Sequence, residues 1–426
     1  MKTKILYTLI LVLSIGLSTI TAQTKDYNTL EYLEMGPSYA NDIFYSVADG
    51  EVLNIPRAGW DIAFFASASS AGIIINEGSG AQLFTWPDGD IDDWDDVDTS
   101  GLYNYWPIIY NNPESWEDGA FNRNSTGYPD CGWGLYDEDI QTYEGDSIFV
   151  IKTTSGAYKK ICIIDKNTND NIYNIKYADL DGWDEQVVEI DLTPFVGKNF
   201  AYYSLATNEL FNREPSAEWD ILFTKYIDIT YDVYGDPYEY LVTGATSNVN
   251  REVNKFHPVP DDFEGYSDLP FETKKNVIGF NWKHFDFASY TWEIEDSTVF
   301  FVRNTDWHVY RIRFTFWQGS SSGYFEFYND PINVTGLEND VDKQKTISVY
   351  PNPATEIVNV SINNEILLDG EIIISDLSGR IVYNTTISES TGNTNLSIST
   401  SDFVPGIYFM SFVGNDIKET QKLVIK

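Results

Sequence analysis

The chain is poor in the residues that most often carry chemistry. Its 426 residues include 2 Cys, 3 His and 3 Met. It has no His-Glu-x-x-His or Cys-x-x-Cys pattern and no phosphate-binding loop, which excludes the enzyme classes that those motifs define. We therefore expect a protein that is not an enzyme. A hydrolase with unrecognised carboxylates stays open as an alternative, because sequence does not show the separation of two carboxylates in space.

Positive charge and long apolar runs are also scarce. The chain has 27 Lys and Arg against 65 Asp and Glu, a formal charge of −38. Such a surface repels polyanions, which excludes nucleic acid as a partner. The one long apolar run, from Ile5 to Leu17, follows Lys2 and Lys4 and leads to Ala22. This pattern predicts a signal peptide over residues 1–22, and no later segment approaches the ~20 apolar residues of a membrane-spanning helix.

Aromatic residues are abundant, and helix-forming stretches rich in Ala, Leu and Glu are not. The chain contains 29 Tyr, 25 Phe and 12 Trp, and aromatic and β-branched residues favour strands. We therefore predict an all-β protein with antiparallel sheets.

Part of the sequence occurs twice. The first copy contains Tyr45-Ser46-Val47 and then Trp60-Asp61-Ile62, and the second contains Tyr203-Ser204-Leu205 and then Trp219-Asp220-Ile221. Such internal similarity indicates duplicated structural units. We predict two tandem antiparallel β domains, at residues 24–195 and 196–335, and a linker at 336–346. In each Trp-Asp pair we expect a buried ring and a carboxylate that accepts backbone N–H bonds.

The last segment, residues 347–426, has the pattern of a small β-sandwich. Short β-branched and aromatic runs alternate there with Asp, Gly, Ser and Asn turns. Its most distinctive motif residues are Tyr350, Pro351, Asn352, Pro353, Gly406 and Tyr408.

Those motifs, with Asp376-Leu377-Ser378-Gly379-Arg380 between them, resemble the type A C-terminal sorting domain of the Bacteroidetes type IX secretion system. The resemblance implies that the secretion machinery is a partner. It also implies export via the periplasm across the outer membrane, and a secreted or cell-surface location.

The duplicated segments and the hairpin at Lys159-Lys160-Ile161 resemble HmuY-type proteins, which are β-rich hemophore-like modules of the same phylum. This family includes members that carry heme through paired axial side chains. The resemblance implies two HmuY-like domains and a non-enzymatic protein that binds heme or another small ligand.

Heme with two axial ligands needs a pair of donors such as His or Met. The first predicted domain has no His, and the second contains all three. We take His257 and His284, which have aromatic neighbours, as the candidate heme ligands.

Calcium is the second candidate cofactor. Asp179, Asp181, Asp184 and Glu185 cluster around Gly182, and closely spaced carboxylates on a turn suit Ca²⁺. The cluster does not complete an EF-hand pattern, so an acidic loop that is simply solvated is the alternative.

Glycan binding or adhesion is an alternative function, because exposed aromatic faces offer sugars an apolar stacking surface. Six tryptophans are expected in or beside loops: Trp86, Trp94, Trp106, Trp116, Trp307 and Trp317.

Cys131 and Cys162 are the two cysteines. Outside the cytoplasm they are a candidate disulfide. The alternative is two buried thiols that act as small apolar side chains.

Overall fold

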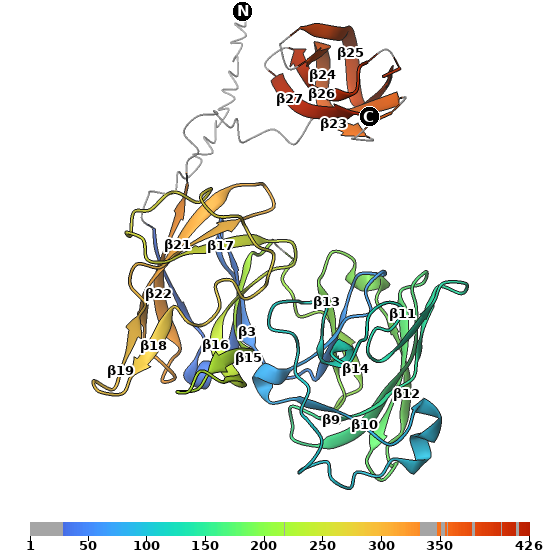
Figure 1. Cartoon of the computed structure of the whole chain (residues 1–426), viewed down its shortest axis with the longest axis vertical. Coiled ribbons are helices and arrows are strands. Elements are labelled where there is room, and N and C mark those ends of the chain that lie inside the picture. Colours follow the sequence, from blue (N-terminus) through green and yellow to red (C-terminus); the bar gives the residue numbers. More distant parts are fainter. Residues whose placement is uncertain are drawn as a thin grey trace, which may run out of the picture. The chain divides into compact units, whose positions relative to one another are not determined.

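The computed structural model describes residues 29–216, 218–332, 347–350, 354–355, 357–376, 380–401, 403–414 and 417–426 (Figure 1). The described residues form two compact units, one up to residue 332 and one from residue 347 onward. The predicted signal peptide and the linker at 336–346 lie outside the described residues.

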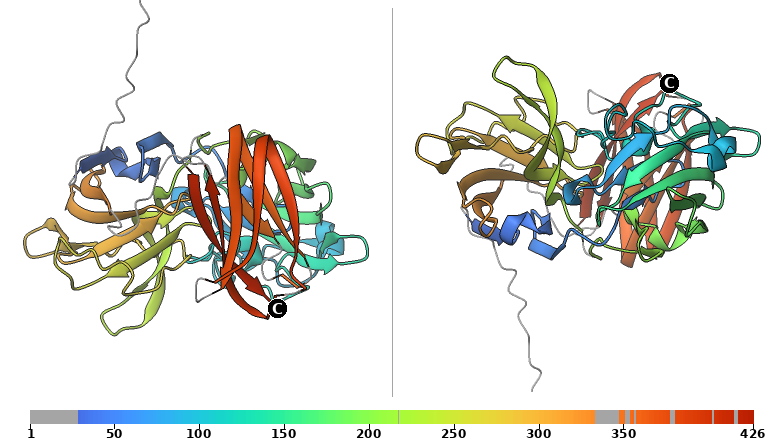
Figure 2. Two further views of the ribbon diagram at one scale, coloured as in Figure 1. Left: turned by 90° about the horizontal axis from the view of Figure 1, so that it is seen from above. Right: turned by 90° about the horizontal axis from the view of Figure 1, so that it is seen from below.

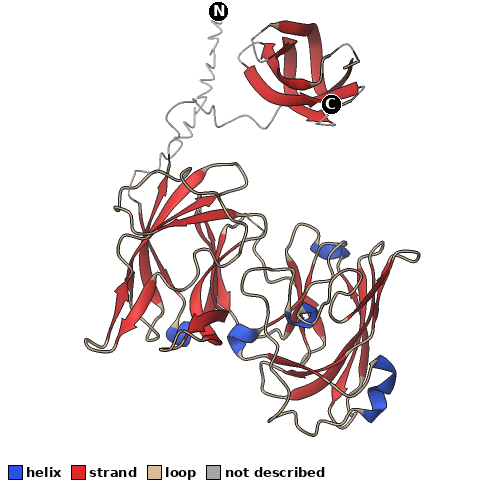
Figure 3. Ribbon diagram, in the orientation of Figure 1, coloured by secondary structure: helices blue, strands red, loops and turns tan. Residues whose placement is uncertain are grey.

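The prediction of an all-β protein is confirmed (Figure 3). Every ladder between named strands is antiparallel. The helices of the described part are short 3₁₀ turns: η1 (Pro37–Tyr39), η2 (Glu77–Ser79), η3 (Ile91–Asp96), η4 (Ala120–Asn122) and η5 (Thr193–Phe195). None of the described helices is long and apolar enough to cross a membrane.

The first unit consists of two lobes, and lobe 1 is made of residues 60–211. Its smaller sheet has the strand order β14 (Glu209–Phe211), β13 (Phe200–Ser204), β4 (Ile62–Phe65), β5 (Ile73–Ile75). Its larger sheet has the order β12 (Gln186–Asp191), β11 (Ile172–Asp179), β10 (Tyr158–Asn167), β8 (Thr142–Gly145), β7 (Gly134–Asp137), and β9 (Ile148–Lys152) pairs with both β10 and β6 (Gln82–Thr85).

Alternation along the strands creates the core of lobe 1. In β11, Tyr173, Ile175 and Tyr177 are buried, whereas Asn174 and Lys176 are partly exposed, as the two-residue period of a strand requires. The inward residues join a core with the fully buried Trp133, Phe64 and Phe149.

Lobe 2 has the same two-sheet plan. Its larger sheet has the order β1 (Leu30–Glu34), β22 (Tyr324–Pro331), β21 (Val309–Trp317), β20 (Val299–Arg303), β17 (Glu252–Phe256). Its smaller sheet has the order β16 (Pro237–Ser247), β15 (Ile221–Tyr231), β2 (Asn41–Ser46), β3 (Gly50–Pro56). The hairpin β18 (Lys283–Asp286) and β19 (Thr291–Ile294) is added to these. Aromatic rings dominate the core of this lobe, where Trp282 stacks on Phe314 at 3.7 Å.

The lobes do not follow the predicted boundary between residues 195 and 196. β1, β2 and β3 lie near the start of the chain, yet they pair with strands of lobe 2. β13 and β14 follow the predicted boundary, yet they belong to lobe 1. Figure 2 shows the dark blue opening segment beside the orange strands that end the unit. Each copy of the repeat therefore gives its opening strands to the lobe built mainly by the other copy.

The exchange is reciprocal at the level of single residues. Tyr45 of β2 pairs with Ile221 of β15, and Tyr203 of β13 pairs with Ile62 of β4. These are equivalent positions of the two repeats. Each smaller sheet thus contains one pair of strands in which the two strands come from different copies, and the two pairs are equivalent.

The Trp-Asp pairs secure the two exchanged strands, and their predicted structural role is confirmed. Asp220 accepts the backbone N–H of Val47 at 2.9 Å, and Asp61 accepts the equivalent N–H of Leu205 at 2.9 Å. The preceding rings, Trp60 and Trp219, are 7% and 5% exposed. Each buried carboxylate therefore satisfies a backbone donor on a strand contributed by the other copy.

The lobes meet where the turn η2 of lobe 1 lies against β15 of lobe 2. Glu77 accepts the N–H of Ile227 across this junction at 2.9 Å. A Cβ on Gly78 would lie 2.2 Å from the carbonyl oxygen of Lys225. Glycine is therefore required here, because any side chain would separate the two lobes.

The second unit is a five-stranded sheet that encloses one core. Its strands are β23 (Ile347–Tyr350), β24 (Ile357–Asp376), β25 (Ile381–Ser399), β26 (Gly406–Gly414) and β27 (Ile417–Ile425). β24 pairs with β23, β25 and β26. Buried residues from β24, β26 and β27, including Val358, Ile374, Phe412 and Leu423, form its core.

Candidate functional site

A groove on lobe 1, here called the tyrosine groove, has the features of a ligand site. Its volume is about 360 Å³, within the range of ~300–1,000 Å³ typical of small-molecule sites. It is lined by Ala68, Ser69, Tyr128, Tyr136, Gln141, Tyr143, Thr168 and Asn169. None of these eight residues is charged, although the chain carries 92 charged side chains (27 + 65).

Three tyrosine rings form the apolar part of the groove. Tyr136 and Tyr143 stand directly opposite each other in the β7–β8 ladder, which brings their ring centroids to 4.6 Å. Tyr128, whose ring is 6.3 Å from that of Tyr136, is 70% exposed. A hydrogen bond from its hydroxyl to Glu138 raises the pKa of Tyr128 to about 12, so the phenol is neutral at physiological pH.

Unpartnered polar groups accompany the rings. Within the described residues, the side-chain amides of Gln141 and Asn169 make no hydrogen bond to the protein, and both residues are exposed. The hydroxyl of Thr168 donates to the carbonyl oxygen of Gln141 at 2.8 Å, which fixes the turns on this side. The groove therefore presents free donors and acceptors next to aromatic faces.

A buried lysine holds one wall of the groove. Lys166 is fully buried and donates to the carbonyl oxygens of Ser67 and Ser70, on either side of Ala68 and Ser69. Its ammonium lies 4.8 Å from the centre of the Tyr173 ring. Burial lowers the pKa of Lys166 to about 7. Lys166 thus positions the loop and has no contact with solvent.

The candidate heme ligands lie next to the same carboxylate. The Nε2 atom of His257 is 3.9 Å from Glu295, and the Nδ1 atom of His284 is 3.8 Å from Glu295. The Nε2 atom of His284 lies 3.3 Å from Glu293, its cross-strand partner in β19. The fold thus brings these two histidines close to one acidic group, and heme ligation by them stays a prediction.

The candidate calcium residues face lysines. Asp179 pairs with Lys159 at 2.7 Å, and Asp184 lies 3.7 Å from the same ammonium. Glu185 accepts the indole N–H of Trp94 at 2.8 Å, whereas Asp181 accepts the backbone N–H of Trp183. Across the part of the chain that the structure describes, no group of three or more His, Cys, Asp or Glu side chains is arranged to hold a metal ion.

The tryptophans expected beside loops are mostly packed into the protein. Trp86, Trp94 and Trp317 are buried, and Trp106 and Trp116 are half-buried. Trp307 is 67% exposed and lies in the β20–β21 turn, with the guanidinium of Arg303 5.4 Å from its ring. The sequence did not single out the tyrosines of the groove, although Tyr136 and Tyr143 flank a polar turn in a short hairpin.

Of the two alternatives for the cysteines, a disulfide or two thiols, the structure has the two thiols. Cys131 and Cys162 are free thiols. Cys162 lies on the face of β10 that packs against Trp86 and Trp94, whereas its neighbours Ile161 and Ile163 face the main core. Cys131 packs against that main core, so the sheet separates the two thiols. Burial raises the pKa of each thiol to about 12.

Thiol titration of the folded protein with a disulfide reagent should therefore show almost no reaction, because the thiolate is the reactive form and both groups are shielded. After unfolding in denaturant without reductant, we expect two thiols per chain. Recovery of none after unfolding would show a disulfide instead.

The residues of the predicted sorting motif lie in the second unit. Gly406 begins β26, and Tyr408 is buried with its hydroxyl donating to the carbonyl oxygen of Val404 at 2.7 Å. Tyr350 ends β23. Pro351, Asn352 and Pro353 lie outside the described residues.

Comparisons with known proteins characterise only this second unit. No curated protein matches the sequence. Among solved structures, dimeric latent PorU from Porphyromonas gingivalis has 9% identity and a TM-score of 0.18 over 93% of this chain. The matched region spans 34% of that chain, and so weak a likeness supports no conclusion on fold or function. Residues 348–426 match the family of secretion system C-terminal sorting domains, which implies export by the type IX secretion system.

Proposed function

We propose that this is an exported, non-enzymatic binding protein whose lobe 1 binds a neutral carbohydrate in the tyrosine groove. The observation that carries the proposal is the composition of the groove, in which three tyrosine rings lie beside free amides and hydroxyls without any charged lining residue. Aromatic faces contact the apolar faces of sugar rings, and amides form hydrogen bonds with their hydroxyls.

The absence of charge favours a neutral ligand over an ion. The chain has a net charge of −38, so an anionic polysaccharide would be repelled by the surrounding field. A metal ion or a cationic ligand would need carboxylates in the lining, and the groove has none. A neutral sugar needs neither and can use all the groups present.

The framework of the groove supports binding without rearrangement. The fully buried Trp133 packs behind Tyr143 at 5.8 Å and donates its indole N–H to Ala71 at 2.9 Å. Lys166 fixes the loop opposite. A preformed site loses less conformational entropy on binding, which favours affinity.

Replacing Tyr128 or Tyr136 with alanine should weaken sugar binding by about tenfold or more, since truncating an aromatic anchor commonly costs over ~1.4 kcal/mol. A glycan array would identify the sugar, and calorimetry would then compare the variants. Tyr234→Ala is the matched control, because Tyr234 is 88% exposed in the turn between β15 and β16, outside the groove.

Equal affinity in the wild type, Tyr128→Ala and Tyr136→Ala would refute the groove as the binding site. Absence of any hit among neutral glycans would refute the proposed function itself. Hemin titration, followed in the Soret band for the wild type and His284→Ala, tests the separate heme prediction.

A further inference from the structure

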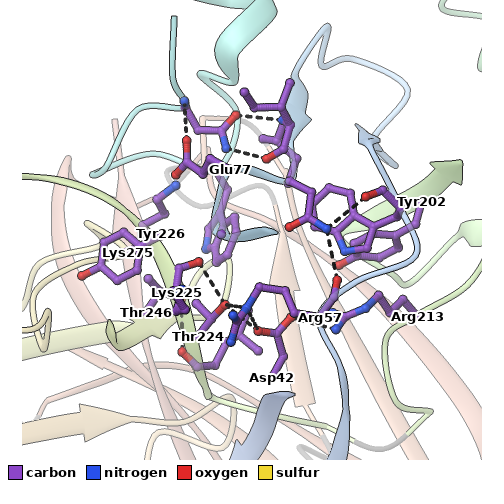
Figure 4. Close-up of a pocket in the computed structure, with 18 residues that line it drawn as sticks. Asp42, Arg57, Glu77, Tyr202, Arg213, Thr224, Lys225, Tyr226, Thr246 and Lys275 are labelled. Atoms are coloured by element: carbon purple, nitrogen blue, oxygen red, sulfur yellow. Dashed lines mark hydrogen bonds and ion pairs between the residues drawn. The ribbon is translucent and has the colours of Figure 1, made fainter. Parts of the chain in front are cut away.

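A second cavity lies inside the first unit, where lobe 1 meets lobe 2 (Figure 4). We call it the junction pocket. Its volume is about 60 Å³, enough for a few water molecules or one small ion. Residues from both lobes line it, among them Trp60, Glu77 and Trp116 of lobe 1 and Lys225 and Lys275 of lobe 2.

The lining is rich in positive charge. It contains four cations, Arg57, Arg213, Lys225 and Lys275, against two anions, Asp42 and Glu77. This excess stands in contrast to a chain with 65 acidic and 27 basic residues. A buried excess of one charge is costly unless an opposite charge compensates it.

The two arginines share one carboxylate. Arg57 contacts one oxygen of Asp42 at 2.7 Å and Arg213 contacts the other at 2.8 Å, as Figure 4 shows. All three residues are at least nine-tenths buried. Because one negative charge faces two positive charges, this group retains a positive charge.

Both carboxylate oxygens of Glu77 already accept backbone hydrogen bonds. One of its oxygens accepts the N–H of Asn111 at 3.0 Å and the other accepts the N–H of Ile227 at 2.9 Å. Burial raises the pKa of Glu77 to about 7, although the charge of Lys275 acts in the opposite direction, so Glu77 compensates Lys275 only in part.

In the described part of the chain, Lys275 has no direct bonding partner for its ammonium. Burial lowers its pKa to about 8, although the charges of Glu77 and Asp228 favour its protonated form. The residue is 5% exposed, and its ammonium lies 4.6 Å from the centre of the Trp116 ring. Within the described residues this ammonium makes no hydrogen bond and no ion pair. Its backbone is fixed between the lobes, since Lys275 donates its N–H to Glu114 at 2.9 Å and accepts one from Ser247 at 2.7 Å.

A second donor from the opposite lobe is also unsatisfied. The indole N–H of Trp60 is buried and has no hydrogen-bond partner, and Trp60 lines the same pocket. Buried donors without an acceptor destabilise a fold. An acceptor in the pocket would therefore be stabilising.

We propose that the junction pocket binds a small oxyanion, a carboxylate or phosphate group, that takes hydrogen bonds from Lys275 of lobe 2 and Trp60 of lobe 1. Such an ion compensates the excess positive charge and links the two lobes. This site is separate from the tyrosine groove and does not depend on the proposed sugar binding.

The test is thermal unfolding of the full chain in chloride buffer of constant ionic strength, with acetate or inorganic phosphate added at low millimolar concentration. This concentration is below the range in which phosphate stabilises proteins by exclusion from their surface. We expect the Tm to rise by several degrees with the logarithm of anion concentration, because the ion binds the folded state alone. The response to acetate compared with phosphate distinguishes the two ligand chemistries.

Two variants assign the effect to the pocket. Trp60→Phe removes the N–H donor and keeps a smaller ring against Tyr202. Lys275→Met removes the charge and keeps the approximate length of the side chain. Each variant should lower the apparent affinity for the anion by about tenfold or more. Lys274→Met is the matched control, because Lys274 is the adjacent residue, is half-exposed and pairs with Glu114 outside the pocket. It should respond as the wild type does.

Isothermal titration of the folded protein with phosphate and acetate gives an independent measurement if Lys275→Met does not fold. The proposal is overturned if both anions leave the wild-type Tm unchanged relative to chloride. It is also overturned if Trp60→Phe retains the full affinity of the wild type.

Discussion

A chain that ends before Ile347 should no longer appear outside the cell. The residues removed are those that match the sorting-domain family, so the exported unit loses the part that the secretion machinery recognises. Immunoblots of the culture medium and of the surface of intact cells would measure the loss. We expect the signal to disappear from both fractions while the protein remains inside the cell envelope.

The truncated protein should still fold, because the first unit has its own cores and forms a separate compact unit. Its Tm after purification is therefore a necessary control. Joining residues 334–426 to a periplasmic reporter should give the converse result, export of the reporter. If truncated and complete chains reach the medium equally, the sorting role is wrong.

Replacing Asp220 with alanine should strongly destabilise the first unit. Asp220 accepts two bonds: the N–H of Val47 and, at 2.6 Å, the guanidinium of Arg251. Asp220 and Arg251 are 3% and 4% exposed. Without Asp220, the buried guanidinium keeps only the exposed carboxylate of Glu218, at 2.7 Å. We therefore expect a cost of about 3 kcal/mol, at the lower end of the range for a broken buried ion pair, and a Tm lower by several degrees.

Denaturant unfolding of the full chain measures this cost. Asp61→Ala should also destabilise, though less, because Asp61 bonds Leu205 and Thr154 and no cation. Glu239→Ala is the control, since Glu239 is exposed on β16, and surface substitutions usually change stability by less than ~0.5 kcal/mol. A change for Asp220→Ala as small as that of the control would mean that the exchanged strand contributes little.

The internal repeat was visible in the sequence, but the exchange of strands between its copies was not. The matching segments around Tyr45 and Tyr203 predict equivalent strands. The lobe that each of these strands joins depends on long-range pairings, such as that of Tyr45 with Ile221, which are 176 positions apart (221 − 45). Local patterns carry no information on such distant pairings, because equivalent strands fit either lobe equally well.

The two candidate binding sites also could not be predicted from local sequence and depend on tertiary contacts. Tyr128, Tyr136 and Tyr143 looked like ordinary strand and loop aromatics, and only the β7–β8 hairpin and the neighbouring loop place their rings in one groove. The junction pocket joins Trp60 to Lys275 through the packing of two lobes. The sequence left open whether Cys131 and Cys162 form a disulfide, and their location on different sides of a sheet keeps the thiols apart.

By itself, the sequence determined that the protein is all-β, that it contains a repeat, and that its C-terminal unit is a sorting domain, since composition, alternation and short motifs are local properties. Only the tertiary structure decided which strands close each lobe, whether the thiols pair, and where uncharged rings or unpaired cations gather. These depend on contacts between residues far apart in the chain, and packing and electrostatics select such contacts only once the sheets have formed.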